Sequence, residues 1–166
     1  MTIRVLIADD QDIIRAGLAT ILGGQPGIEV IAQAADGLEA VELARRLRPD
    51  VCLLDIRMPR LDGVEATRRL AGPDVEDPLA VVVITTFDTD EYISGALRAG
   101  ARGFLLKDAG PALLVQAIHA AAEGDGFAAV RGLADDFDVR LGVEDHGEPR
   151  THDVLVVGDE HADGHA

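Results

Sequence analysis

The sequence predicts an α/β fold in which helices cover both faces of a doubly wound, five-stranded parallel sheet. Short aliphatic runs recur about every 20 to 30 residues, and helical periodicity occupies the intervals between them. Runs that are apolar on both faces are typical of parallel strands buried between helices. Regular alternation of strands and helices implies right-handed crossovers. With 166 residues, 48% of them hydrophobic, the chain is long enough for one such domain and too short for two.

Five aliphatic runs are the predicted strands: IRVLIA at 3–8, IEVIAQA at 28–34, VCLL at 51–54, AVVVIT at 80–85 and GFLL at 103–106. Apolar residues at helical spacing mark the intervening helices: Ile14, Leu18, Ile21 and Leu22; then Leu38, Val41, Ala44 and Leu47; then Tyr92, Ala96 and Ala99; and finally Leu114, Ala117, Ile118 and Ala121. Asp62 and Gly63 are expected to form a turn before the third helix. The fifth strand–helix unit ends near Gly124.

Charge and cysteine content restrict the classes of partner. Lysine and arginine total 15 against 30 acidic residues, and a net charge of -15 disfavours binding to nucleic acid or anionic lipid. The N-terminus, MTIRVLIADD, has an aliphatic stretch far shorter than a signal peptide or a membrane span requires. The single cysteine, Cys52, lies inside an apolar run and is expected to be a buried thiol in a reducing compartment. We therefore expect a cytoplasmic protein without membrane contact.

Polar residues stand where four of the five strands end: Asp9 and Asp10 after the first, Asp55 after the third, Thr85 and Thr86 at the end of the fourth, and Lys107 after the fifth. In a doubly wound sheet, ligands bind beyond the carboxyl ends of the strands. Carboxylates gathered there repel one another unless a cation lies among them, and a site with only oxygen ligands suits magnesium. An aspartate beside that metal can act as a nucleophile toward phosphorus.

Each of these residues also has an ordinary structural interpretation. Acidic residues after a strand often cap the next helix, Thr85 alone is typical of a strand end, and Lys107 alone is typical of a solvated surface charge. The coincidence of all of them at one edge of the sheet favours a functional site for phosphoryl transfer, in which the lysine neutralises charge.

Four motifs resemble the receiver domain of bacterial two-component response regulators: ADD at 8–10, LLDIRMPRLDG at 53–63, VVVITTFD at 81–88 and GARGFLLKD at 100–108. The resemblance covers residues 2–124. The residues of the last two motifs are most similar to those of the NarL/FixJ (LuxR-type) class. The resemblance implies a flavodoxin-like sheet with strand order 2-1-3-4-5.

The resemblance also implies the chemistry of the site. Asp55 would accept a phosphoryl group from a phosphohistidine on a sensor histidine kinase. Asp10 and Asp55 would bind Mg²⁺ directly, Asp9 would bind it through water, and the backbone carbonyl of Arg57 would be a further ligand. Lys107 would pair with Asp55 at rest and with the phosphoryl oxygens afterwards.

A conformational switch is implied in the same way. Thr85 would move inward to donate its hydroxyl to the phosphoryl group, and the rotamer of Phe104 would follow that movement. The rearrangement would change the face formed by the fourth helix, the fifth strand and the fifth helix, which contacts partners or forms a homodimer in the family. The chain would assist its own phosphorylation and dephosphorylation without being an enzyme in the usual sense.

Residues 125–166 are expected to be an acidic C-terminal extension, either a solvated tail or disordered, with a short strand at 153–157. The last 41 residues contain 3 arginines, no lysine and 10 acidic residues. Because they lack the periodicity and the charge of a recognition helix, DNA binding by this chain is not expected. His161 and His165 have the spacing of a metal pair on a helix, but Gly164 lies between them and no third ligand is fixed, so we favour no metal there.

Two other functions compete with phosphorelay signalling. One is a truncated or frame-altered NarL/FixJ-type transcriptional regulator whose DNA-binding module is missing. The other is a phosphohydrolase with an aspartate nucleophile. Such enzymes commonly have a second aspartate two residues after the first, and here that place is Arg57. A phosphate-binding G-x-x-x-x-G-K-[ST] loop is also absent from the sequence.

Overall fold

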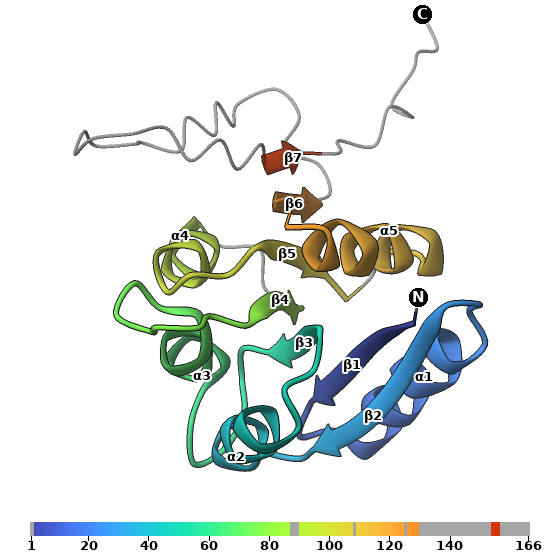
Figure 1. Cartoon of the computed structure of the whole chain (residues 1–166), viewed down its shortest axis with the longest axis horizontal. Helices are drawn as coiled ribbons and strands as arrows, with labels where there is room; N and C mark the ends of the chain where they lie inside the picture. The colour runs from blue at the N-terminus through green and yellow to red at the C-terminus, as the bar shows by residue number, and fades with distance from the viewer. Residues whose placement is uncertain (1, 87–89, 108, 125, 130–153, 157–166) are drawn as a thin grey trace, which may run out of the picture.

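The computed structural model describes residues 2–86, 90–107, 109–124, 126–129 and 154–156. The elements in chain order are β1 Ile3–Ala8, α1 Asp12–Gly23, β2 Ile28–Ala34, α2 Gly37–Leu47, β3 Val51–Asp55, α3 Gly63–Ala71, β4 Ala80–Thr85, α4 Asp90–Arg98, β5 Gly103–Leu106, α5 Pro111–Ala122, β6 Gly126–Ala129 and β7 Val154–Val156 (Figure 1). In the described part of the chain, no helix combines the length and the apolar content needed to cross a bilayer.

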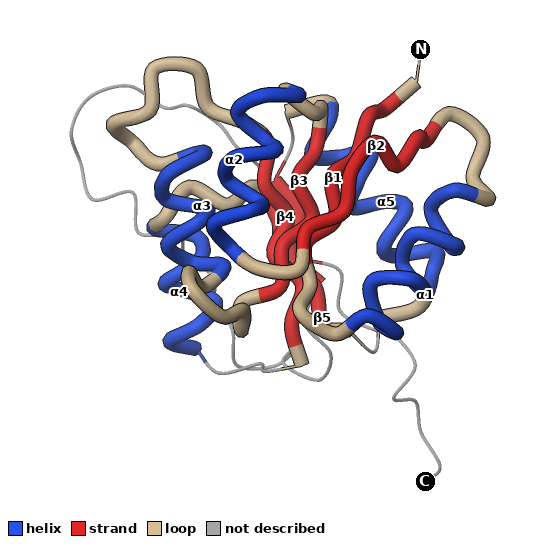
Figure 2. Tube along the Cα trace, turned by 90° about the horizontal axis from the view of Figure 1, so that it is seen from below, coloured by secondary structure: helices blue, strands red, loops and turns tan. Residues whose placement is uncertain are grey.

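All strand pairs are parallel, and the first five strands lie in the order β2-β1-β3-β4-β5. The predicted fold class and strand order are therefore confirmed. Helices α2, α3 and α4 cover one face of the sheet, and α1 and α5 cover the other (Figure 2). The carboxyl ends of β1, β3, β4 and β5 consequently meet at one edge, where the polar residues follow.

Alternation of side chains along each strand explains why the strands in the middle of the sheet are almost entirely apolar. Leu54 of β3 joins the core beneath α2, α3 and α4, whereas its neighbour Leu53 joins the core beneath α1 and α5. Both side chains are fully buried. Successive residues of β3 therefore face opposite helical layers, and no position of β3 or β4 is exposed to solvent.

The N-terminal caps of α2 and α3 hold the loops near the site in place. The Asp36 carboxylate caps α2 by accepting from the backbone N–H of Glu39 at 2.9 Å. The Asp62 carboxylate caps α3 by accepting from the backbone N–H of Glu65 at 2.8 Å. The predicted turn at Asp62 and Gly63 is thus the N-terminal boundary of α3, and the cap stabilises it by about 1 kcal/mol.

The sheet continues past β5 with two short parallel strands, β6 and β7 (Figure 1). Strand β7 lies within 153–157, where a short strand was predicted, whereas β6 was not anticipated. In the β5–β6 register, Ala128 is the partner of Phe104. The other residues of the expected acidic extension, including the histidine pair, lie outside the described residues.

Candidate phosphoryl-transfer site

Three carboxylates meet at the carboxyl edge of the sheet. Asp9 directly follows β1, Asp55 is the last residue of β3, and Asp10 follows Asp9. Ligand oxygens of all three lie within 4.8 Å of one another. Asp9 and Asp55 are buried, with 0% and 4% of their surfaces exposed, while Asp10 is exposed to solvent. The structure thus brings together the three acidic residues that the sequence analysis selected.

Lys107 supplies the positive charge between the two buried carboxylates. Its Nζ lies 2.8 Å from Asp9 Oδ2 and 3.2 Å from Asp55 Oδ2. Its backbone N–H donates to the carbonyl of Thr85 at 2.8 Å, which ties the turn after β5 to the end of β4. The expected pairing with Asp55 is present, but the shorter contact is with Asp9, which sequence reasoning did not propose as a partner.

The electrostatics of the cluster follow from burial and crowding. Burial raises the pKa of Asp55, and the negative charge of Asp9 raises it further, although the Lys107 ammonium acts in the opposite direction. Burial works against the charged form of Lys107. The hydrogen bond to Asp9 and the charges of both carboxylates outweigh it, so the pKa of Lys107 lies above its ordinary value. The site therefore places one ammonium group between two buried carboxyl groups.

The donor set fits a divalent cation. Asp9 is held by backbone contacts: its Oδ1 accepts from the N–H of Gln11 at 2.9 Å, and its carbonyl accepts from Arg15 Nη1 at 2.7 Å. Its Oδ2 is buried, and among the described residues its one polar contact is with the Lys107 ammonium at 2.8 Å. A buried oxygen with spare acceptor capacity beside two further carboxylates is the environment that Mg²⁺ prefers. The predicted carbonyl ligand, Arg57, lies in the loop directly after Asp55.

A close backbone approach positions the loop after Asp55. Gly63 lies against the carbonyl of Asp55, and a Cβ built on Gly63 would lie 2.0 Å from that oxygen. The backbone N–H of Gly63 donates to the carbonyl of Ile56 at 2.7 Å. The Gly63 carbonyl in turn accepts from the buried Thr67 hydroxyl at 2.6 Å. Gly63 therefore allows α3 to begin in direct contact with the backbone that carries Asp55.

The two predicted switch residues are both buried. Thr85 ends β4 and is 1% exposed, and Phe104 in β5 is fully buried in the core beneath α2, α3 and α4. In the β4–β5 register, Val83 is the partner of Phe104 and Thr85 is the partner of Leu106. Phe104 therefore lies two residues before the partner of Thr85 on the neighbouring strand, and its ring packs in the core layer that supports the site.

One contact beside the site was not predicted. Arg57 Nη2 donates to the hydroxyl of Tyr92 on α4 at 3.3 Å, and the Arg57 guanidinium carbon lies 6.0 Å from the centre of the Tyr92 ring. Sequence periodicity placed Tyr92 on the apolar face of a helix but gave no reason to aim its hydroxyl at this loop. No pattern in the sequence indicates this contact.

Comparison with known families gives a single assignment. A model of the response regulator receiver domain matches residues 5–119. The transcriptional regulatory protein LiaR of Bacillus subtilis is 44% identical over 123 residues, which cover 74% of this chain and 57% of LiaR. The response regulator GacA of Pseudomonas viridiflava is 41% identical over 127 residues, which cover 75% of this chain and 58% of GacA. The chain spans just over half the length of these curated relatives.

Solved structures agree with this assignment. The receiver domain of a response regulator NarL from Mycobacterium tuberculosis is 36% identical, with a TM-score of 0.70 over 74% of this chain and 98% of that one. A LuxR-family response regulator from Aurantimonas is 34% identical, with a TM-score of 0.71 over 77% of this chain and 89% of that one.

Proposed function

Because the chain belongs to the response regulator receiver domain family, we propose that Asp55 is its phosphoacceptor and that a sensor histidine kinase is the donor. Receiver domains are phosphoacceptors in phosphorelay signalling rather than enzymes in the usual sense, and response regulators interact with sensor histidine kinases. The observation that carries the proposal is the cluster of Asp9, Asp10 and Asp55 around the Lys107 ammonium. No other group of three or more metal-binding side chains was found in the described ranges.

The proposed reaction follows from the geometry. An Asp55 carboxylate oxygen attacks phosphorus as the phosphorus–nitrogen bond of the donor phosphohistidine breaks. The imidazole leaves with the electron pair of that bond, and an acyl phosphate forms on Asp55. Mg²⁺ held by Asp10, Asp55, the Arg57 carbonyl and, through water, Asp9 would neutralise charge on the transferred group.

The remaining side chains would stabilise the product. Phosphorylation adds acceptor oxygens and negative charge at Asp55. Lys107, already 3.2 Å from Asp55 Oδ2, needs little movement to pair with those oxygens. Thr85 would donate its hydroxyl to them, and Phe104 would change rotamer as Thr85 moves. Because the ring of Phe104 is fully buried, that change requires repacking of the surrounding core.

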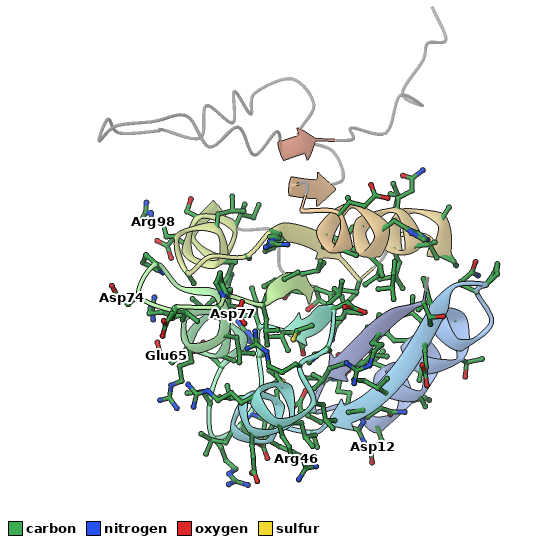
Figure 3. All side chains as sticks on the ribbon, viewed as in Figure 1. Asp12, Arg46, Glu65, Asp74, Asp77 and Arg98 are labelled. Atoms are coloured by element: carbon green, nitrogen blue, oxygen red, sulfur yellow. The ribbon has the colours of Figure 1, made fainter. Side chains whose placement is uncertain are left out.

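Intact-mass spectrometry tests this proposal. The protein is incubated with acetyl phosphate, with and without Mg²⁺, beside the variants Asp55→Asn and Asp12→Asn. Asp12 is the control because it begins α1 near the same edge but has a side chain that is 90% exposed and points outward (Figure 3). We expect one added phosphoryl group that requires both Mg²⁺ and Asp55 and that persists in Asp12→Asn. Phosphorylation of Asp55→Asn to the same extent would refute the assignment.

A homodimer through α4, β5 and α5 is a further part of the proposal. Strand β6 pairs with β5 along Gly103–Leu105, so the open edge of β5 is already occupied by this chain. A dimer through this face would therefore use the two helices rather than strand pairing. Light scattering with and without the phosphomimetic beryllofluoride, which was used on a relative, tests it: a mass that stays monomeric in both states would exclude the dimer.

Transcriptional regulation is the alternative function, because the curated relatives are transcriptional regulatory proteins and this chain spans just over half their length. The charge of this chain makes DNA binding by its own residues unfavourable. Gel-shift titration with promoter DNA separates the two functions, since saturable binding by the chain alone would favour the alternative.

We also propose that the protein is cytoplasmic. The buried free thiol of Cys52 supports this location, because such a thiol is typical of a reducing compartment.

A further inference from the structure

A side-chain bridge joins the phosphoacceptor loop to helix α4. Arg57 lies two residues after Asp55, and Tyr92 lies in the first turn of α4. Arg57 Nη2 donates to Tyr92 Oη at 3.3 Å, and the guanidinium lies over the ring with 6.0 Å between its carbon and the ring centre. Two elements 35 residues apart in the sequence are therefore connected directly beside the site.

The bridge forms part of the wall of a cavity that adjoins the acidic cluster. This cavity has a volume of about 470 Å³, and its lining includes Asp10, Arg57, Met58 and Tyr92. Arg57 thus lines the same space as Asp10, one of the three acidic residues of the cluster. Asp55 itself precedes Arg57 by two residues, so negative charge added to Asp55 would arise at the sheet edge from which the Arg57 loop begins.

We propose that the Arg57–Tyr92 bridge exists at rest and opens when Asp55 is phosphorylated, so that the first turn of α4 is released by the charge on Asp55. This inference rests on the proposed function and adds a second route to the switch, independent of Thr85 and Phe104. Arg57 and Tyr92 are positioning residues in this mechanism.

The difference in strength between the two partners drives the opening. A 3.3 Å contact to a neutral phenol is at the long end of the hydrogen-bond range. Phosphoryl oxygens are charged acceptors, and guanidinium groups bind them with shorter and stronger hydrogen bonds, often in pairs. Phosphorylation therefore offers Arg57 a better partner than Tyr92, and this differential interaction is what a two-state element needs in order to shift its population.

The rest of α4 is anchored independently of the bridge. Ile93 and Ala96 are buried in the core beneath α2, α3 and α4, whereas Tyr92 is only partly buried against it. Loss of the bridge should consequently loosen the first turn without unfolding the helix. The effect is local, so backbone hydrogen exchange within Asp90–Arg98 is a suitable readout.

Hydrogen exchange measured by mass spectrometry on the full chain tests the inference in two states, at rest and with beryllofluoride and Mg²⁺. The test variant is Tyr92→Phe, which removes only the hydroxyl and keeps the ring. The control is Arg98→Ala, which removes an exposed arginine at the other end of α4, on the outside of the molecule (Figure 3). At rest, the α4 backbone N–H groups that donate to carbonyls of its first turn should exchange about three- to tenfold faster in Tyr92→Phe than in the unmodified protein. With beryllofluoride this difference should disappear, because the bridge is already open.

A double variant provides the second measurement. If Arg57 and Tyr92 act only through each other, Arg57→Ala combined with Tyr92→Phe should exchange no faster than Arg57→Ala alone. An acceleration that is equal in both states would reduce the bridge to a structural contact and overturn the inference, as would the absence of acceleration at rest. If beryllofluoride does not change hydrogen exchange around Asp55 in the unmodified protein, the proposed function is wrong, and the inference that rests on it is wrong as well.

Discussion

Replacement of Gly63 by alanine is the most demanding test of how the site is supported. The added methyl group would lie 2.0 Å from the Asp55 carbonyl oxygen and 2.8 Å from both the Asp55 carbonyl carbon and the Cα of Ile56. Ordinary contacts begin at 3.4 Å, and all three obstacles are backbone atoms, so no side-chain rotation relieves the clash. Either α3 or the loop after β3 must move by roughly an ångström or more.

The magnitude follows from three contributions. Overpacking costs about 1–3 kcal/mol, and a backbone obstacle places this case at the upper end. The movement weakens the hydrogen bond from the Gly63 N–H to the Ile56 carbonyl, which contributes about 1 kcal/mol. Alanine recovers less than about 1 kcal/mol of helix propensity, because Gly63 is the first residue of α3. We expect a net loss of about 3 kcal/mol in the free energy of unfolding.

Urea denaturation measures this loss, and Gly17→Ala provides the matched control. Gly17 is exposed in the middle of α1 with no atom within 4 Å of an added Cβ, so alanine there should stabilise the protein by about 0.5–1 kcal/mol. Gly63→Ala should also slow phosphorylation of Asp55 by acetyl phosphate under conditions where the variant remains folded, because the backbone of Asp55 itself is displaced. Equal urea midpoints for the two variants would refute the reasoning.

Three further predictions follow from the site. Because the pKa of Asp55 is raised in the folded state, mainly by burial, stability is lost as pH rises from its ordinary value of 3.8 through the raised value. Asp55→Asn removes this loss and should be more stable than the unmodified protein at pH 7, with an advantage in urea that shrinks toward pH 3; an advantage that does not change with pH would contradict this. Asp10→Asn should weaken Mg²⁺ binding about tenfold in calorimetry while Asp12→Asn leaves it unchanged, and equal affinities would exclude Asp10 as a ligand. Asp62→Ala should remove the α3 cap at a cost of about 1 kcal/mol in thermal unfolding, and an unchanged midpoint would show that the bond to the Glu65 N–H contributes nothing.

The fold could be predicted because the same alternation of apolar strand runs and helical periodicity recurs along the chain. Strands β3, β4 and β5 are buried throughout, β1 is buried over its last four residues, and the helices show their own periodicity, so errors at single residues do not change the topology. Strand β6 was missed because GFAA has four residues and no alternation, and its partner is decided by where α5 ends. A run of four residues carries too little information to predict which strand it will pair with.

The side chains of the site were predictable only as a group. Parallel strands bring their carboxyl ends to one edge whatever the loops do, so the meeting of Asp9, Asp55 and Lys107 follows from topology alone. Which carboxylate lies nearer to the ammonium depends on a difference of 0.4 Å between two contacts. Loop packing decides that difference, and no local sequence pattern encodes loop packing. The Arg57–Tyr92 contact is of the same kind, since it depends on how α4 is placed against a loop distant in sequence.

The central strand also contains a built-in probe of global opening. Cys52 is the only cysteine, is fully buried in β3, and has a pKa that burial raises to about 12. A thiol reagent requires both access and a thiolate, and the folded protein offers neither. Labelling of Cys52 can therefore proceed only through molecules in which the sheet has come apart. Its rate under native conditions would report the frequency of those rare openings without any denaturant.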